Sequence, residues 1–139
     1  MNRQTESRKA EHVRIVLEEN VQARTRTSGL ESVEFVHYAL PEMDYAEIDC
    51  GTTFLGRRFK APFFISSMTG GYGDAEQINK DLARACEKQG IGLGLGSQRA
   101  MVENPALKKT FYVRDAAPKV FLGANLGAVQ LREYGAKAA

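Results

Sequence analysis

Three short apolar segments begin about thirty residues apart, at positions 62–66, 91–95 and 120–124. About thirty residues is the length of a strand-helix-strand unit, so the spacing predicts three parallel strands joined by helices. The segments are apolar throughout instead of alternating, which is typical of strands covered on both faces. This pattern restricts the second half of the chain to an α/β fold with a parallel sheet.

The connection between the first two segments carries the clearest helix signal. Asp74 is a candidate N-cap with Gln77 three residues later, and Gly90 is a candidate stop after the last turn. An apolar stripe at helical spacing predicts which face is buried. Its members are Ile78, Leu82, Ala85 and Cys86. Further along, Asn104 and Pro105 predict a helix running through Leu107, and another helix is expected to begin near Gly127.

The N-terminal part of the chain has a different character. Apolar side chains at three- and four-residue steps predict a helix over residues 6–23. Residues 33–59 carry short β-type runs, and residues 55–57 predict the turn of a hairpin. We therefore expect an N-terminal helix and hairpin region over residues 1–60, followed by parallel strands and helices over residues 61–139.

Each apolar segment runs at its C-terminal end into small and polar residues, at positions 66–71, 94–99 and 123–127. In parallel α/β proteins this edge binds ligands, because its loops vary freely while backbone amides and helix N-termini point toward the ligand. Glycine lets a ligand approach the backbone, and Ser, Thr and Asn supply short hydrogen-bonding groups. Three such loops in succession favour a shared ligand site over three simple turns.

The glycines of the second segment do not form a dinucleotide-binding fingerprint. Gly92 and Gly94 lie within the expected strand, whereas that fingerprint places its glycines in the turn that opens the next helix. Alternating glycines in a strand instead indicate close packing against a barrel interior or a flat ligand.

A cluster of cations lies on the expected N-terminal helix. Arg8 and His12 are four residues apart and share one face, with Lys9 beside them. Cations in a first turn oppose the helix dipole unless an anion binds there. A phosphate site and a solvated face neutralised by nearby glutamates both remain open. Arg99, after the second strand, is a further candidate for binding an anion.

Composition excludes several classes of function. The 19 lysines and arginines nearly balance the 17 acidic residues, so no nucleic acid or anionic membrane is expected as a partner. The polar N-terminus lacks a signal-peptide apolar region, and no run approaches the roughly 20 apolar residues of a membrane span. A cytoplasmic protein is therefore expected.

The chain contains two cysteines, Cys50 in an expected strand and Cys86 in an expected helix. They have no metal-ligand spacing and are interpreted as buried reduced thiols.

The chain offers little acid-base equipment of its own. It contains no nucleophile with a neighbouring base, no metal-binding motif and no Walker sequence, and His37 has no acidic or nucleophilic neighbour. If the protein is an enzyme, a bound cofactor is expected to carry the difficult chemistry.

Four motifs together resemble the type 2 isopentenyl-diphosphate isomerases. They are Arg8-Lys9 followed by His12, Ser66-Ser-Met-Thr-Gly-Gly71, Gly96-Ser-Gln-Arg-Ala100 and Ala124-Asn-Leu-Gly127. Each motif alone is weak, whereas the four in this order and at this spacing are specific. The resemblance implies an FMN-dependent (β/α)8 barrel that interconverts isopentenyl and dimethylallyl diphosphate in isoprenoid synthesis. Reduced FMN, Mg²⁺ and NADPH as reductant are implied with it, as is a homo-oligomer.

The resemblance also implies roles for individual residues. The substrate diphosphate would be bound by Arg8, Lys9, His12, Ser97, Gln98 and Arg99. The flavin would be held by Ser67, Met68, Thr69, Gly70, Ser97 and Asn125. Reduced FMN would protonate the double bond and remove a proton from the neighbouring carbon, so no catalytic side chain is assigned.

The length of the chain differs from that of a complete barrel. Such a barrel needs about 250 residues, and this sequence of 139 residues contains three of the eight strands. The ligands of Mg²⁺ are expected beyond Ala139, so no metal ligand is assigned. Because most of the barrel is missing, we expect the chain alone to be inactive. Three parallel strands leave exposed edges, so we also expect it to be unstable, or to pair with itself or with another chain.

Two other functions remain open: a different FMN-dependent barrel oxidoreductase, and a non-catalytic phosphate-binding remnant of a barrel.

Overall fold

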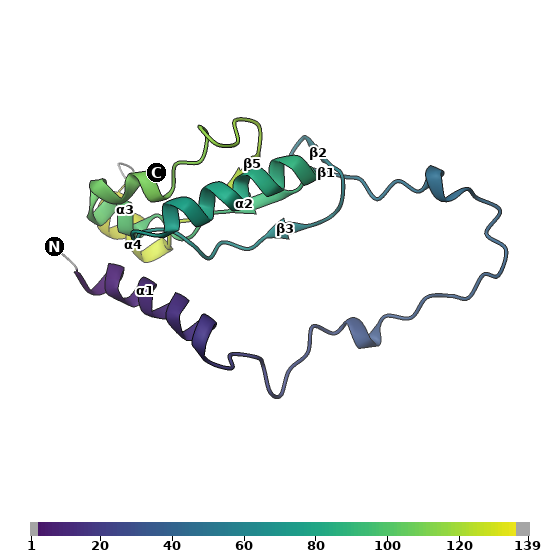
Figure 1. Ribbon diagram of the computed structural model, residues 1–139, viewed down its shortest axis with the longest axis horizontal. Coiled ribbons are helices and arrows are strands. Elements are labelled where there is room, and N and C mark those ends of the chain that lie inside the picture. Colours follow the sequence, from purple (N-terminus) through teal and green to yellow (C-terminus); the bar gives the residue numbers. More distant parts are fainter. Residues whose placement is uncertain (1–2, 136–139) are drawn as a thin grey trace.

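The computed structural model describes residues 3–135, and side chains from residue 7 onward. Figure 1 shows a compact body of strands and helices, with helix α1 beside it and a long arm connecting the two. The elements are α1 (Arg3–Glu18), β1 (Thr52–Phe54), β2 (Arg57–Phe59), β3 (Phe64–Ile65), α2 (Ala75–Gln89), β4 (Gly92–Gly94), α3 (Arg99–Glu103), β5 (Phe121–Gly123) and α4 (Ala128–Tyr134). Three 3-10 helices are η1 (Leu30–Ser32), η2 (Tyr45–Glu47) and η3 (Pro105–Thr110).

The three expected parallel strands are present, and they are shorter than their apolar segments. They form one sheet in the order β3-β4-β5, in which Gly92 pairs with Phe64 on one side and with Phe121 on the other. Strand β4 is buried along its length. The expectation that all three strands are covered on both faces is wrong for β3, because Phe64 is 45% exposed.

The core lies between α2 and one face of this sheet. Leu93 of β4 is fully buried there, together with Val113 from the connection that precedes β5. Burying side chains of this size stabilises the fold by about 1.5–3 kcal/mol each. The buried apolar cluster comprises Ala83, Cys86, Leu93, Leu95, Ala100, Phe111, Val113, Ala117 and Val120.

Helix α2 begins and ends where expected, but its start is not capped as expected. Asp74 has helical dihedral angles and its side chain makes no capping hydrogen bond. Gln77 instead donates to Asp81 one turn later. Gly90 does end the helix, in the left-handed conformation that favours glycine. The predicted apolar face was partly wrong, because Ala85 is exposed whereas the polar Asn79 is fully buried.

The hairpin is confirmed over β1 and β2, which pair antiparallel. Its turn consists of Leu55 and Gly56, both with positive φ of 48° and 71°, as in the tight turns that match strand twist. Arg57 lies in strand β2 and not in the turn. The other β-type runs predicted within residues 33–59 are wrong: residues 33–51 form no strand, and η2 interrupts them.

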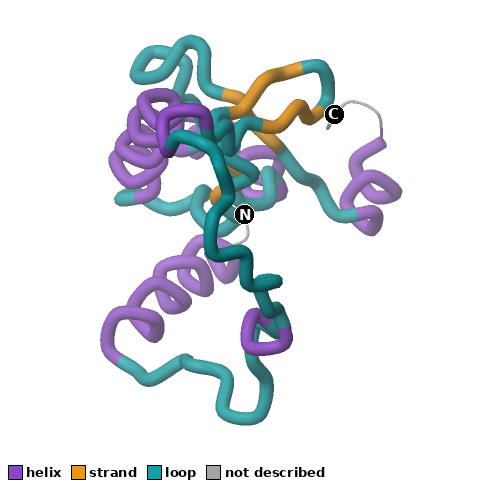
Figure 2. Tube along the Cα trace, turned by 90° about the vertical axis from the view of Figure 1, so that its right-hand side faces the viewer, coloured by secondary structure: helices purple, strands orange, loops and turns teal. Residues whose placement is uncertain are grey.

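Helix α1 is displaced from its predicted range of 6–23. It begins at Arg3 and ends at Glu18. Beyond its end, Asn20 Oδ1 accepts the amide of Gln22, a local side-chain contact that competes with continuation of the helix. The arm of residues 19–51 follows and arches away from the body, as the view turned by 90° also shows (Figure 2).

Among the described residues, three helices follow the later strands: α3 and η3 after β4, and α4 after β5. Asn104 Oδ1 accepts the amide of Ala106, and Pro105 opens η3 as expected, although this helix is of the 3-10 type and continues to Thr110. Helix α4 begins after Gly127, as predicted. The five-residue α3 has no counterpart among the predicted helices. Within residues 3–135, no helix is both long and apolar enough to cross a membrane.

Candidate functional site

The three loops that follow β3, β4 and β5 are hydrogen-bonded into one edge. The Gly96 amide donates to the Thr69 carbonyl at 2.7 Å. On the other side, Asn125 Nδ2 donates to the Leu95 carbonyl at 2.9 Å, and the Gln98 amide donates to the Asn125 carbonyl at 3.0 Å. The middle loop is therefore tied to both neighbours, as the parallel order of the strands requires.

Glycines permit the close approach of the first two loops. A Cβ at Gly96 would lie 2.6 Å from the backbone oxygen of Thr69, and one at Gly94 would lie 2.9 Å from the Ser67 amide nitrogen. Neither distance is compatible with a side chain unless the backbone moves. On the opposite face of the sheet from Leu93, the Phe64 ring occupies the space that a Cβ at Gly92 would need. The alternating glycines therefore pack against an aromatic ring, in agreement with their predicted role in close packing.

The loop after β3 exposes several groups that can hold a ligand. Ser67 and Met68 are exposed, Thr69 is half-buried and Gly70 is buried. Within residues 3–135, the amides of Met68, Thr69 and Gly70 donate no hydrogen bond. Gly70 and Gly71 have φ of 143° and 83°, a conformation that side chains rarely adopt. Free amides on a sharply turned backbone suit the phosphate and ring oxygens of a flavin.

Of the three predicted anion-binding residues on α1, Lys9 reaches this edge within the described residues. Its Nζ donates to the Gly70 carbonyl at 2.5 Å and to the Ser97 carbonyl at 3.4 Å, and lies 5.5 Å from the centre of the Phe111 ring. Burial of the ammonium group, together with the charge of neighbouring Arg8, lowers the pKa of Lys9. Lys9 therefore connects α1 to two of the three loops.

Arg8 and His12 are both exposed, and neither side chain makes a hydrogen bond or an ion pair within the described residues. Because α1 begins at Arg3, these residues lie in its second and third turns. The prediction that they join a helix N-terminus in binding an anion is therefore wrong in that detail. The side chains face solvent and remain accessible to a ligand.

The loop after β4 supplies Ser97, Gln98 and Arg99, all half-buried. Arg99 Nε donates to Glu103 Oε1 at 2.6 Å, and this carboxylate raises the pKa of Arg99. The hydroxyl of Tyr134 in α4 also donates to Glu103, at 3.2 Å. The guanidinium thus has a carboxylate partner, which holds it in place and partly neutralises its charge.

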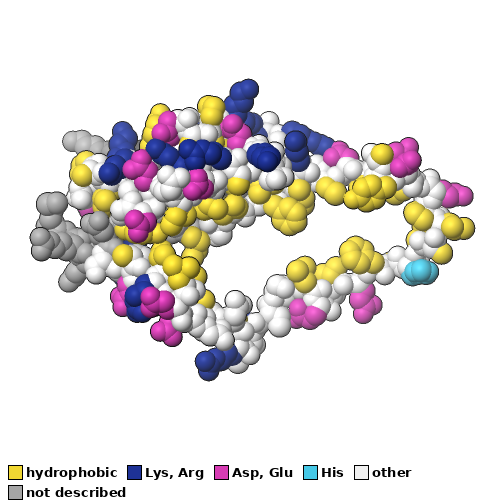
Figure 3. Space-filling view, in the orientation of Figure 1, with side chains coloured by type: hydrophobic (Ala, Val, Ile, Leu, Met, Phe, Trp, Pro, Cys, Tyr) yellow, Lys and Arg dark blue, Asp and Glu magenta, His cyan; other side chains and the backbone are white. Residues whose placement is uncertain are grey.

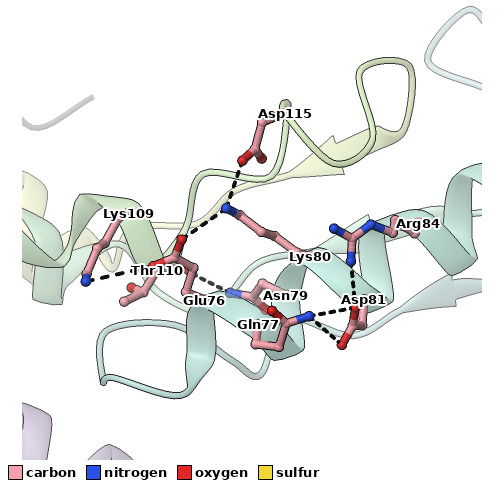
Figure 4. A network of polar contacts seen from close by, with 9 residues as sticks. All are labelled: Glu76, Gln77, Asn79, Lys80, Asp81, Arg84, Lys109, Thr110 and Asp115. Carbon is pink, nitrogen blue, oxygen red and sulfur yellow. Dashed lines mark hydrogen bonds and ion pairs between the residues drawn. The ribbon is translucent and has the colours of Figure 1, made fainter.

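A buried polar pair beneath the β3 loop was missed from the sequence. Asn79 of α2 and Thr110 of η3 are both fully buried. Asn79 Nδ2 donates to the Thr110 carbonyl at 2.7 Å and to the Thr69 carbonyl at 3.3 Å, and Figure 4 shows the first of these contacts. The available signal was the position of Asn79, which shares its helix face with Ala83 and Cys86.

The described residues form no metal site: no group of three or more His, Cys, Asp or Glu side chains lies close enough together to hold an ion. A flavin fits better, since one edge presents free amides, the Ser67 and Ser97 hydroxyls and the Asn125 side-chain oxygen. These groups are neutral and short, as expected for a site that holds a cofactor through its backbone.

An apolar pocket of about 410 Å³ lies elsewhere, beside β1, β2 and β3, and is lined by residues that include Phe54, Phe59 and Phe64. All three rings pack edge-on against Phe121, with centroids 5.2 to 6.1 Å apart. None of the three polar loops lines this pocket. It is therefore distinct from the edge that the three loops form.

Residues 1–110 match the family described as FMN-dependent dehydrogenase. This match covers most of the chain, so the chain belongs to that family of flavin-dependent proteins.

Comparison with individual proteins shows which flavin-dependent enzymes the chain is similar to. The isopentenyl-diphosphate delta-isomerase of Methanoregula boonei is 53% identical over 133 residues, which are 95% of this chain and 36% of the relative. The enzymes of the same name from Nostoc sp. and Rickettsia prowazekii are 52% and 55% identical, over 95% and 92% of this chain. The chain spans little more than a third of the length of these relatives. The resemblance to isopentenyl-diphosphate isomerases is thereby confirmed.

Proposed function

We propose that the chain belongs to an FMN-dependent isomerase, built as a (β/α)8 barrel, that interconverts isopentenyl and dimethylallyl diphosphate. One observation carries the proposal. The three strand-end loops that bear the motif residues are hydrogen-bonded into a single edge, and Lys9 reaches that edge from α1. The relatives from three different organisms, each an isopentenyl-diphosphate delta-isomerase by name, support the same activity.

In this proposal the flavin lies along the C-terminal edge of the sheet. Ser67, Met68, Thr69 and Gly70 hold it mainly through their backbone amides, with Ser97 and Asn125 contributing side chains. The support is the exposure of Ser67 and Met68 and the free amides of residues 68–70. The glycine contacts keep this loop close to β4.

The substrate diphosphate is bound beside the flavin by residues of α1 and of the β4 loop. Arg8 and His12 offer solvent-facing cationic or hydrogen-bonding groups, and Lys9 supplies an ammonium group at the edge itself. Ser97, Gln98 and Arg99 approach from β4. Because Glu103 already pairs with Arg99, Arg99 contributes mainly directed hydrogen bonds, and the net positive charge comes from α1.

When bound, reduced FMN supplies the acid-base chemistry that moves the double bond. The residues of this chain bind and orient, and within the described residues no side-chain pair is arranged for proton transfer. Mg²⁺ is proposed as counter-ion of the diphosphate, with ligands outside the described residues. The proposal also includes NADPH as the reductant of the flavin, a homo-oligomeric state and a cytoplasmic location.

The decisive experiment assays the protein expressed from its native gene with reduced FMN, Mg²⁺ and isopentenyl diphosphate. Formation of dimethylallyl diphosphate without net flavin oxidation is the expected result, and its absence would overturn the proposal. Flavin absorbance distinguishes one alternative, because an oxidoreductase would show net reduction of oxidised FMN by its substrate. Binding of phosphate without any FMN affinity would instead indicate the non-catalytic barrel remnant.

Two variants test the division of roles. Arg8→Ala should weaken diphosphate binding and leave FMN bound, whereas Asn125→Asp should weaken FMN binding, because its carboxylate faces the Leu95 carbonyl. Arg14→Ala is a matched control for the first, since among the described residues Arg14 pairs only with Glu18, on the exposed side of the same helix. Equal losses of both ligands in both variants would contradict the assignment.

A further inference from the structure

The loop that ends in Gly71 is held from below by a chain of buried hydrogen bonds. Thr110 Oγ1 accepts the Gly71 amide at 2.9 Å and donates to the Leu107 carbonyl at 2.7 Å. Asn79 Nδ2 bridges the Thr110 and Thr69 carbonyls. The Thr110 hydroxyl therefore uses both its donor and its acceptor capacity within the protein.

These contacts fix the loop on the side away from the proposed ligand. Thr69 directs its carbonyl toward the Gly96 amide and Asn79, and Gly71 directs its amide toward Thr110. The amides of Met68, Thr69 and Gly70 have no such partner within residues 3–135. The Gly70 amide lies between the two anchored groups and shares its planar peptide unit with the Thr69 carbonyl, and the Met68 and Thr69 amides directly precede that carbonyl. The anchors therefore orient this stretch of backbone before any ligand arrives.

Burial makes these anchors strong and specific. Asn79 and Thr110 have no exposed surface, so water cannot replace a lost partner, and an unpaired group there costs the full desolvation penalty. Asn79 Oδ1 is itself buried without a partner in the described part of the chain. A side chain that needed only to fill this space would be apolar, as its neighbours Ala83 and Cys86 are.

We propose that Thr110 and Asn79 are positioning residues that hold the Thr69–Gly71 backbone in the shape that presents its free amides to the flavin. The proposal rests on flavin binding at this edge, as proposed above. Neither residue touches the ligand: each acts through the loop. Loss of either anchor lets the amides turn away, so that binding the flavin must first reorder the loop.

The test compares Thr110→Val with Thr110→Ser in the protein expressed from its native gene. Valine keeps the shape of threonine and removes the hydroxyl, whereas serine keeps the hydroxyl and removes the methyl group. FMN affinity is measured by fluorescence titration, the Gly71 amide by hydrogen exchange, and stability by the melting temperature without FMN. If Thr110 positions the loop, Thr110→Val should bind FMN roughly tenfold more weakly and exchange its Gly71 amide faster than wild type. In Thr110→Ser, the FMN affinity and the Gly71 exchange rate should both stay near wild type.

Other results overturn the proposal. If Thr110→Val keeps wild-type affinity and Gly71 protection, or if both variants lose affinity in proportion to their melting temperatures, then Thr110 has only a packing role. Should Thr110→Val fail to fold, Thr110→Ser decides alone, because positioning predicts wild-type FMN affinity and packing predicts a loss. Failure of the wild-type protein to bind FMN overturns the proposed function instead, and Gly71 exchange then still shows whether Thr110 holds the loop.

Discussion

Lys9 Nζ donates a hydrogen bond of 2.5 Å to the carbonyl oxygen of Gly70, which lies 61 residues further along the chain. The bond joins α1 to the loop after β3, and the nearby Ser97 carbonyl extends the contact to the loop after β4. Between α1 and the body runs the arm of residues 19–51, whose apolar side chains include Phe35 and Val36 at 95% and 94% exposure. Apolar side chains line the hollow between arm and body (Figure 3). Because the arm buries little, Lys9 has a central part in holding α1 at the edge.

Replacing Lys9 by methionine should release α1 from the body. Methionine keeps the apolar contact with Phe111 and removes the ammonium group, so the contact should weaken by about 1–2 kcal/mol, as for hydrogen bonds to charged groups that are partly exposed. Hydrogen exchange of the α1 amides measures the effect. Arg14→Met is the control, because the ion pair of Arg14 in the described part of the chain is with Glu18 on the same helix. Equal exchange in the two variants would contradict a docking role for Lys9.

Gly96→Ala should separate the first two loops. The new Cβ would lie 2.6 Å from the Thr69 backbone oxygen, so the loop must move and the bond from the Gly96 amide is strained. Overpacking of this kind costs about 1–3 kcal/mol, which a denaturant melt measures. Gly73→Ala is the matched control, since nothing lies within 4 Å of a Cβ there, and its stability should change little. A stable Gly96→Ala protein with wild-type affinity for FMN would contradict the close approach of these loops.

Much of the parallel sheet could be predicted because its signals are local. The apolar runs and the spacing between them predict three parallel strands, and Gly90 predicts the end of α2; these predictions are confirmed, whereas burial of both faces is not found for β3. The polar ends of the strands likewise predict one shared edge, since parallel strands bring their C-terminal ends together. The loops after β3, β4 and β5 do meet there.

The failures lie where distant contacts override local pattern. Residues 33–51 have strand-like composition, but no strand forms because no partner strand lies beside them among the described residues. Asp74 has the residue type of a cap and does not act as one, since its backbone is already helical. Helical periodicity places Asn79 on the buried face of α2, but it does not reveal the partners of its side chain, the carbonyls of Thr69 and Thr110, which lie 10 and 31 residues away.

The two cysteines should react differently with iodoacetamide. The prediction of a buried Cys50 within a strand is wrong, because this residue is exposed and precedes β1, whereas Cys86 is buried as expected. Burial also raises the pKa of the Cys86 thiol, which reduces the thiolate that reacts. In native protein at pH 8, mass mapping should find label on Cys50 alone, and on both residues after denaturation. Native labelling of Cys86 at the rate of Cys50 would contradict its burial.

An ion pair between α2 and the connection before β5 should make stability depend on pH in the acid range. Lys80 Nζ lies 2.8 Å from Asp115 Oδ2 and 3.0 Å from Glu76 Oε1, as Figure 4 shows. The hydrogen bond from Lys80 lowers the pKa of Asp115 below its ordinary value of 3.8. As the pH falls, the Asp115 carboxylate is therefore protonated in the unfolded chain before it is protonated in the folded protein. The stabilisation from the ion pair is present above pH 3.8 and is lost as the pH falls through the lower pKa of the folded state.

Asp115→Asn tests this relationship directly. The variant should melt at a lower temperature than wild type at pH 6, and the difference should shrink progressively below pH 3.8 as Asp115 of the wild type becomes protonated. Added salt should also reduce the difference at pH 6, because the pair is partly exposed and is screened. A difference in melting temperature that stays constant from pH 6 to pH 2.5 would mean that Asp115 stabilises the fold through neutral hydrogen bonds instead of its charge.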